Sequence, residues 1–278
     1  MNLSIKLFTL FIIFRFVGIF AQSNNYLFLT DEDLKYGMHN VKHYETFSKY
    51  CTGYNLDVLK AIDIVQLSDT TGGGYFVGVK ANPPESPIGY NLCLLGNKLL
   101  EAPRKTSYCS GASYSVFIEA LNLIFKESNQ ILPDSVIEFM RMQEKDGSRR
   151  EDDIKYWGKW NTDGYGNQIA LVQYSGMGKQ VCAKDALPGD FVNISWKNGN
   201  GHSTVFLGWY INAENDTNIV YFSSQKATNG LGDQIVNINS IDEVVFVRLT
   251  EPEKLFTGKF NENVVNKIKG EIIFRGNK

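Results

Sequence analysis

The sequence is poor in the residues that mark several function classes. Its 278 residues contain only 3 histidines and 4 cysteines, and no lysine or arginine run extends beyond isolated pairs such as Arg149–Arg150. Lysine and arginine total 28 against 30 aspartate and glutamate residues, which gives a formal net charge of −2. A chain without a basic patch lacks the electrostatic signature of a nucleic-acid partner or of an anionic membrane surface. We therefore expect neither partner.

Long apolar segments are also scarce, and the most apolar one is at the N-terminus. There Lys6 precedes a first apolar run, and Arg15 separates it from a second. Neither run approaches the roughly 20 residues that a membrane-spanning helix needs. We interpret residues 1–21 as a secretory signal peptide cleaved after Ala21, rather than as a membrane anchor. The mature protein is expected to be secreted or periplasmic.

Cysteine is scarce, but disulfides can form in an exported protein, so the pairing of the cysteines must be considered. Four cysteines allow two bridges, whereas at most one bridge forms if one of them is a catalytic thiol. Their number does not choose between these alternatives. The four are Cys51, Cys93, Cys109 and Cys182.

The order of hydrophobic patterns predicts an α+β fold. Apolar residues at helical spacing predict helices over residues 53–66 and 113–125, and a third helix that starts near Pro133. From Leu187 onward, alternating segments such as LPGDFVNISW and EVVFVRL predict antiparallel strands. Short strands are also expected in YFVGVKA and NLCLLGNKLL. The glycine-rich polar segment 145–168 is interpreted as a surface loop, such as a lid or a substrate-site loop.

Cys109 lies in TSYCSGASYSVF, a polar setting immediately before the strongest helical pattern of the chain. The N-terminus of a helix has unpaired N–H groups and a dipole that favour an anion, so we expect a lowered thiol pKa there. Ser110 and Gly111 allow a tight turn that leaves the sulfur accessible, and the Cys109 amide is placed to stabilise an oxyanion. The alternative is a structural disulfide with Cys93 or Cys51.

A cysteine nucleophile needs a base, and the three histidines are the main candidates. His202 falls in GNGHSTVFLGW at the start of a predicted strand, where it is suited to Cys–His catalysis; the alternative is an ordinary turn residue. His39 and His43 are four residues apart and would share one face of a helix. A metal pair there lacks a nearby third ligand, so we interpret them as an exposed polar helix face.

These segments resemble the papain-like cell-wall cysteine peptidases and amidases of the NlpC and CHAP types. YCSGASYSVF is similar to their nucleophile segment, and LPGDFVNISWKNGNGHSTVFLGW to their second block, in which a P-G-D turn precedes the histidine strand. The resemblance covers about residues 105–225 and implies a helix carrying the cysteine, packed on an antiparallel sheet. We assign 105–278 to the catalytic domain and 22–104 to an N-terminal extension or an elaboration of the same domain.

The resemblance implies a third catalytic position, a polar residue on the strand after the histidine strand that orients the imidazole. We favour Gln225 there, with Asn229 as a weaker candidate and a strand end without a catalytic role as the alternative. Among substrate contacts we place Ser110, Ser224 and Tyr108. Many NlpC-type enzymes carry an aspartate at the position of Tyr108, and its absence puts recognition of a free peptide amine in doubt.

The resemblance thus implies a cysteine hydrolase of peptide or amide bonds, with peptidoglycan as the substrate class and without a metal or other cofactor. Cys109 would attack the carbonyl, and His202 would take and return the proton. Acyl transfer on the same apparatus is one alternative. A disulfide-stabilised exported domain without catalytic activity is the other.

Overall fold

The computed structural model describes residues 26–75, 90–101, 108–142, 144, 156–157, 166–265 and 267–273. The predicted signal peptide, most of the predicted YFVGVKA strand and most of the segment 145–168 lie outside these residues. Within the described part, no helix combines the length and the apolar character needed to cross a membrane.

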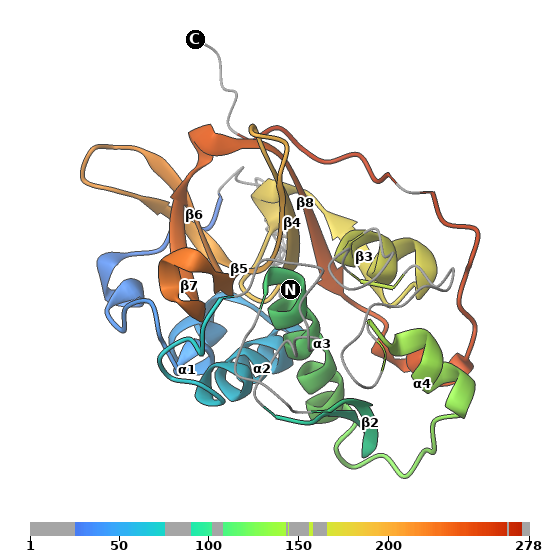
Figure 1. Ribbon diagram of the computed structural model, residues 1–278. Helices are drawn as coiled ribbons and strands as arrows, with labels where there is room; N and C mark the ends of the chain where they lie inside the picture. Colours follow the sequence, from blue (N-terminus) through green and yellow to red (C-terminus); the bar gives the residue numbers. More distant parts are fainter. Residues whose placement is uncertain are drawn as a thin grey trace, which may run out of the picture.

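The described residues form an antiparallel sheet in the order β3-β8-β4-β5-β6-β7 (Figure 1). A separate hairpin pairs β1 with β2. The predicted α+β class is therefore confirmed. The strands are β1 (Leu92–Leu94), β2 (Asn97–Leu100), β3 (Gly178–Val181), β4 (Phe191–Trp196), β5 (Gly201–Ile211), β6 (Thr217–Gln225), β7 (Gly230–Asn237) and β8 (Ile241–Leu249).

Helix α3 packs against β5 and β6, and α2 packs against α3 (Figure 1). The α-helices are α1 (His43–Phe47), α2 (Asn55–Leu67), α3 (Cys109–Ile124) and α4 (Asp134–Met140). A π-helical segment spans Ile169–Tyr174, and short 3₁₀ segments span Asp31–Leu34, Ser48–Tyr50, Ala183–Asp185, Lys226–Thr228, Ile238–Ser240 and Pro252–Thr257.

The core lies on both faces of the sheet, and the alternation of β5 divides it. Val205 and Leu207 belong to the main core, which also contains Phe117 of α3. Phe206 and Trp209 belong to a smaller core on the opposite face. Successive side chains of a strand point to opposite faces, which explains why Phe206 lies opposite Val205 and Leu207. The register shift between Phe206 and Gly208 then turns Trp209 to the face of Phe206. Residues of α2 share the main core with α3.

The P-G-D turn before β4 is held by a buried carboxylate. Asp190 is fully buried and accepts hydrogen bonds from the Asn55 side chain, the Leu187 amide and the Arg248 guanidinium, at distances between 2.7 and 2.9 Å. Gly189 adopts φ +93°, and a Cβ there would lie 2.9 Å from the Asn55 carbonyl oxygen. The turn therefore joins α2, β4 and β8, and its aspartate has a structural role.

Candidate active site

Cys109 is the first residue of α3, as the sequence predicts for a thiol at a helix N-terminus. The helix begins there because Tyr108 is extended and its carbonyl accepts the first helical hydrogen bond, from the Ala112 amide at 2.8 Å. The helix starts four residues before the predicted start because Ser110, Gly111 and Ala112 are small enough to be buried in the first turn.

The thiol is more enclosed than predicted, with 4% of Cys109 exposed. Burial raises its pKa, while hydrogen bonding from the backbone N–H groups of Ser203, Ser110 and Cys109 itself opposes that shift. Burial outweighs the amides, so the expectation of a net lowered pKa is wrong for this structure. The resting group is the neutral thiol.

Buried hydroxyls hold the start of α3 against the start of β5. The Ser113 and Ser203 Oγ atoms lie 2.7 Å apart. The Trp157 indole donates to Ser113 at 3.1 Å, and the Asn167 amide donates to Ser203 at 3.1 Å. Since Ser203 follows His202 directly, this network fixes where the thiol and the imidazole meet.

His202 lies near the start of β5, opposite Ile194 of β4. Its ring packs near those of Trp196 and Tyr221, with centroid distances of 6.1 and 5.4 Å. Burial lowers its pKa to about 4, and the neighbouring Gln225 side chain opposes that shift only in part. The imidazole is therefore neutral at physiological pH and free to accept a proton.

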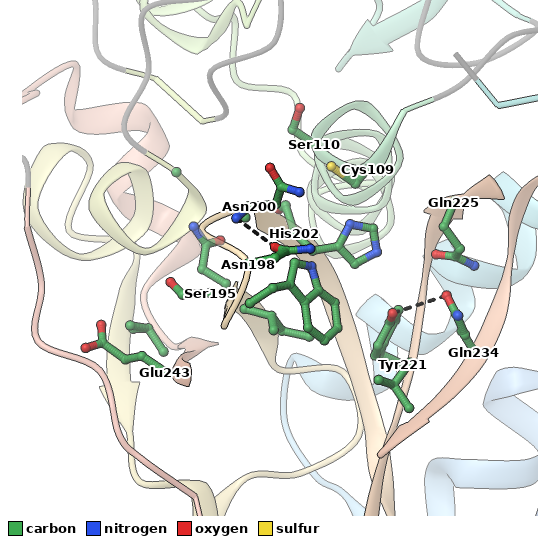
Figure 2. Close-up of a pocket in the computed structure, with 18 of the residues that line it drawn as sticks. Cys109, Ser110, Ser195, Asn198, Asn200, His202, Tyr221, Gln225, Gln234 and Glu243 are labelled. Atoms are coloured by element: carbon green, nitrogen blue, oxygen red, sulfur yellow. Dashed lines mark hydrogen bonds between the residues drawn. The ribbon is translucent and has the colours of Figure 1, made fainter. Parts of the chain in front are cut away.

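Gln225 ends β6, and Figure 2 shows the imidazole of His202 between the Cys109 sulfur and the Gln225 amide. The Gln225 Nε2 donates to the Thr228 hydroxyl at 2.6 Å and to the Gly232 carbonyl at 3.0 Å. These bonds leave Oε1 on the side of the imidazole (Figure 2). Both Gln225 Oε1 and His202 Nε2 are buried without a hydrogen-bond partner among the described residues. A small adjustment would join them.

One pocket of about 920 Å³ contains all three side chains. Ser110 also lines it, and the buried Ser110 Oγ makes no hydrogen bond within the described part of the chain. The remaining lining combines uncharged polar side chains with apolar ones, which suits a ligand that carries amide or hydroxyl groups. Its polar members include Asn193, Ser195, Asn198, Asn200 and Gln234, and its apolar members are Ile194, Trp196, Val236, Val245 and Ile268.

The structure does not bring Tyr108 and Ser224 to this pocket. Tyr108 is 3% exposed and belongs to the main core, because the extended backbone before α3 places its side chain there. Ser224 is fully buried and alternates with Gln225 along β6, so it lies on the other face of the sheet. Asn229 is exposed on the turn before β7 and does not line the pocket. The prediction that Tyr108 and Ser224 contact the substrate is therefore wrong for this pocket.

All four cysteines are free thiols in the structure. Cys51 is buried, Cys93 is half-buried and Cys182 is exposed. The alternative of a disulfide from Cys109 to Cys93 or to Cys51 is therefore not what the structure has.

The interpretation of His39 and His43 as an exposed helix face is wrong. His43 is fully buried at the start of α1, and its ring nitrogens lie 2.8 Å from carboxylate oxygens of Asp63 and Asp233. His39 precedes the helix, and its Nδ1 contacts the Leu231 carbonyl oxygen at 3.1 Å. The acidic partners come from α2 and β7, far away in the sequence, so local spacing did not reveal them.

Comparisons of this chain with protein-family models, with curated proteins and with solved structures gave no match. Function is therefore inferred from the geometry of the site and from the resemblance of its motifs.

Proposed function

We propose that the protein is an exported papain-like cysteine hydrolase that cleaves amide bonds in peptidoglycan peptides. The observation that carries this proposal is the convergence of Cys109, His202 and Gln225 in one pocket, in the order sulfur, imidazole, amide (Figure 2). A cysteine at the first turn of a helix that packs on an antiparallel sheet is the layout implied by the papain-like resemblance. Four free thiols count against the disulfide-stabilised alternative.

The raised pKa of Cys109 and the lowered pKa of His202 suit general-base catalysis by an initially neutral pair. His202 takes the thiol proton as the sulfur attacks the carbonyl carbon, and the carbonyl π electrons move to oxygen. The tetrahedral intermediate then collapses, and the imidazolium gives its proton to the leaving amine. Water then attacks the thioester carbonyl carbon while the same imidazole takes its proton. The carbon–sulfur bond breaks, and the imidazolium returns the proton to the sulfur.

Gln225 acts as a positioning residue. Its Oε1 would accept a hydrogen bond from the imidazole nitrogen remote from the sulfur, which fixes the ring and stabilises the imidazolium. The two donors on its Nε2 hold the amide in the orientation that this requires.

Digestion of purified peptidoglycan tests the proposal, with mass spectrometry of the released fragments to name the bond. We expect cleavage by the wild type and none by Cys109→Ala. The matched control is Cys182→Ala, which removes an exposed thiol outside the pocket and should cleave normally. Cleavage that survives in Cys109→Ala, or no cleavage by the wild type, would count against the proposed activity.

A further inference from the structure

A carboxylate lies in the pocket at a distance from the thiol. Glu243 of β8 lines the cavity that contains Cys109 and His202. Among the described residues that line it, only Glu243 and Lys226 carry a full charge at neutral pH. Lys226 follows Gln225 at the end of β6, and β4 and β5 separate that strand from β8. The two charges therefore lie on opposite sides of the thiol–imidazole pair.

The strand register gives the separation between Glu243 and the base. Glu243 pairs with Ser195 of β4. Ser195 pairs in turn with Gly201 of β5, the residue before His202. Neighbouring strands lie about 4.8 Å apart, so two steps across the sheet place the backbone of Glu243 about 10 Å from that of Gly201. Figure 2 shows Glu243 and Ser195 on one side of the imidazole and Gln225 on the other. About three extended residues, or one long side chain, span this interval.

The Glu243 carboxylate is held in place by the C-terminal segment and lacks a cationic partner. The Gly270 amide donates to its Oε1 at 3.0 Å. A Cβ at Gly270 would lie 2.6 Å from the Val244 carbonyl oxygen, so this close approach requires glycine. Two backbone hydrogen bonds between Val244 and Glu271, at 2.8 and 2.9 Å, fix the segment along β8. Oε2 makes no hydrogen bond or ion pair within the described part of the chain, so it is available to a ligand.

The wall between Glu243 and the thiol offers a further acceptor. Asn193 and Ser195 alternate on β4 and face the same side of the sheet as Glu243. The Asn193 Oδ1 atom is buried without a hydrogen-bond partner among the described residues, and Asn193 lines the same pocket. A carboxylate and an unpaired carbonyl oxygen together favour a group that only donates. An ammonium group is such a donor, because it has three N–H bonds and no acceptor.

We propose that Glu243 selects the substrate by binding a primary ammonium group that lies about 10 Å from the scissile carbonyl. The inference rests on the hydrolase function proposed above, and it narrows the substrate class to amides with a lysine-like side-chain amine near the cleaved bond. Glu243 contacts the substrate only through this remote group and takes no part in bond making. Because the contact is the same in the ground state and in the transition state, its loss should act mainly on KM.

An affinity label tests this contact without requiring turnover. The label is the bromoacetyl amide of cadaverine, whose chain ends in an ammonium group, and the neutral counterpart is the same compound with that amine acetylated. Alkylation forms a carbon–sulfur bond at Cys109, transfers the thiol proton to His202 and releases bromide. Mass spectrometry of the Cys109 peptide measures the rate in the Cys182→Ala background. We expect the cationic label to react about tenfold faster than the neutral one, the effect of a hydrogen bond to a charged group.

Glu243→Gln keeps the shape of the side chain and an acceptor for the Gly270 amide, and it should abolish this preference. Asp242→Asn is the matched control, because it removes a neighbouring carboxylate that points to the other face of β8 and does not line the pocket. It should retain the preference of the parent. Equal rates of the two labels in the parent, or a preference that survives in Glu243→Gln, would overturn the role of Glu243.

The second readout is cleavage of soluble peptides released from peptidoglycan, before and after acetylation of their amino groups. Acetylation removes the positive charge. It should raise KM about tenfold for the parent and far less for Glu243→Gln, with little change in kcat. The same KM for both forms of the peptide in the parent would show that Glu243 does not select a cation. A label preference that depends on Glu243, without cleavage of any peptide, would overturn the peptidoglycan hydrolase proposal and retain the ammonium site.

Discussion

The Ser113 hydroxyl of α3 lies 2.7 Å from the Ser203 hydroxyl of β5, in a buried network that also includes Trp157 and Asn167. This contact joins the helix that carries the nucleophile to the strand that carries the base. We expect Ser203→Ala to lower the free energy of unfolding by about 1–3 kcal/mol, because it leaves buried donors unpaired. Cleavage should also slow, as α3 loses its fixed position against β5.

Ser115→Ala is the matched control for this contact, since the Ser115 hydroxyl bonds only to the Gly111 carbonyl within α3. Urea denaturation and peptide cleavage measure the two effects. A Ser203→Ala protein whose stability and kcat both equal those of Ser115→Ala would show that the contact does not position the site.

Local sequence encodes most of what the site needs at α3 and β5. Small residues at 110–112 allow the helix to start in a buried position, and the apolar stripe anchors it on the sheet. Period-two alternation predicts the strands, and glycine before His202 marks the start of β5. These features depend on neighbours in the chain, so Cys109 and His202 could be assigned to one site from the sequence.

Contacts between distant segments could not be predicted in the same way. The Gly73–Gly230 bridge brings Tyr75 to the pocket and joins residues with no shared local pattern. His43 looked like a surface residue because its partner carboxylates follow 20 and 190 positions later. The motif resemblance predicts Tyr108 at the pocket, where many NlpC-type enzymes carry an aspartate, but the extended backbone before α3 places its side chain in the core.

The pH dependence of cleavage should reflect the pKa of the His202 imidazole. Burial lowers its pKa to about 4, so the base is lost only when the pH falls toward that value. We expect kcat/KM of the wild type to be flat from pH 7 down to about pH 5, and to fall tenfold per pH unit well below pH 4. Stability must be followed in parallel. A loss of activity centred near pH 6.5, with the protein still folded, would contradict the buried neutral imidazole.

Gln225 should affect the same pH profile through its position beside His202. Gln225→Glu places a carboxylate near the imidazole and should raise its pKa, which moves the acid limb of kcat/KM upward by about one unit. Gln225→Ala should lower kcat by about tenfold or more without moving that limb upward, because the ring loses its orientation. If the acid limb of kcat/KM does not shift in Gln225→Glu, the side chain at position 225 does not interact with the imidazole.

Asp190 should be essential for the fold and not for the chemistry. Asp190→Asn removes the charge that pairs with Arg248 at 2.7 Å in a buried setting. We expect a loss of about 3 kcal/mol in the free energy of unfolding, because the guanidinium and the Asn55 amide lose a buried acceptor. Asp57→Asn, which breaks only the half-buried surface pair with Lys60, should cost less than about 1 kcal/mol. Equal urea midpoints for the two variants would contradict the structural role.

The ion cluster of His43 should make stability depend on alkaline pH. Burial opposes protonation, but the carboxylates of Asp233 and Asp63 outweigh it and raise the pKa of His43 to about 9. The folded state therefore holds this proton more tightly than the unfolded state, whose histidine titrates near 6.5. The stabilisation is fully present below pH 6.5 and is lost as the pH rises through 9, with an upper limit of about 3 kcal/mol.

Urea midpoints of the wild type and of His43→Gln at pH 6, 7.5 and 9 measure this dependence. The wild type should lose stability across this range. His43→Gln should be less stable at pH 6, because the two carboxylates then face a neutral amide, and its midpoint should change less with pH. His39, which also lies near Asp233, is retained in both proteins and cancels in the comparison. Parallel pH profiles of the two proteins would show that the buried imidazolium does not control alkaline stability.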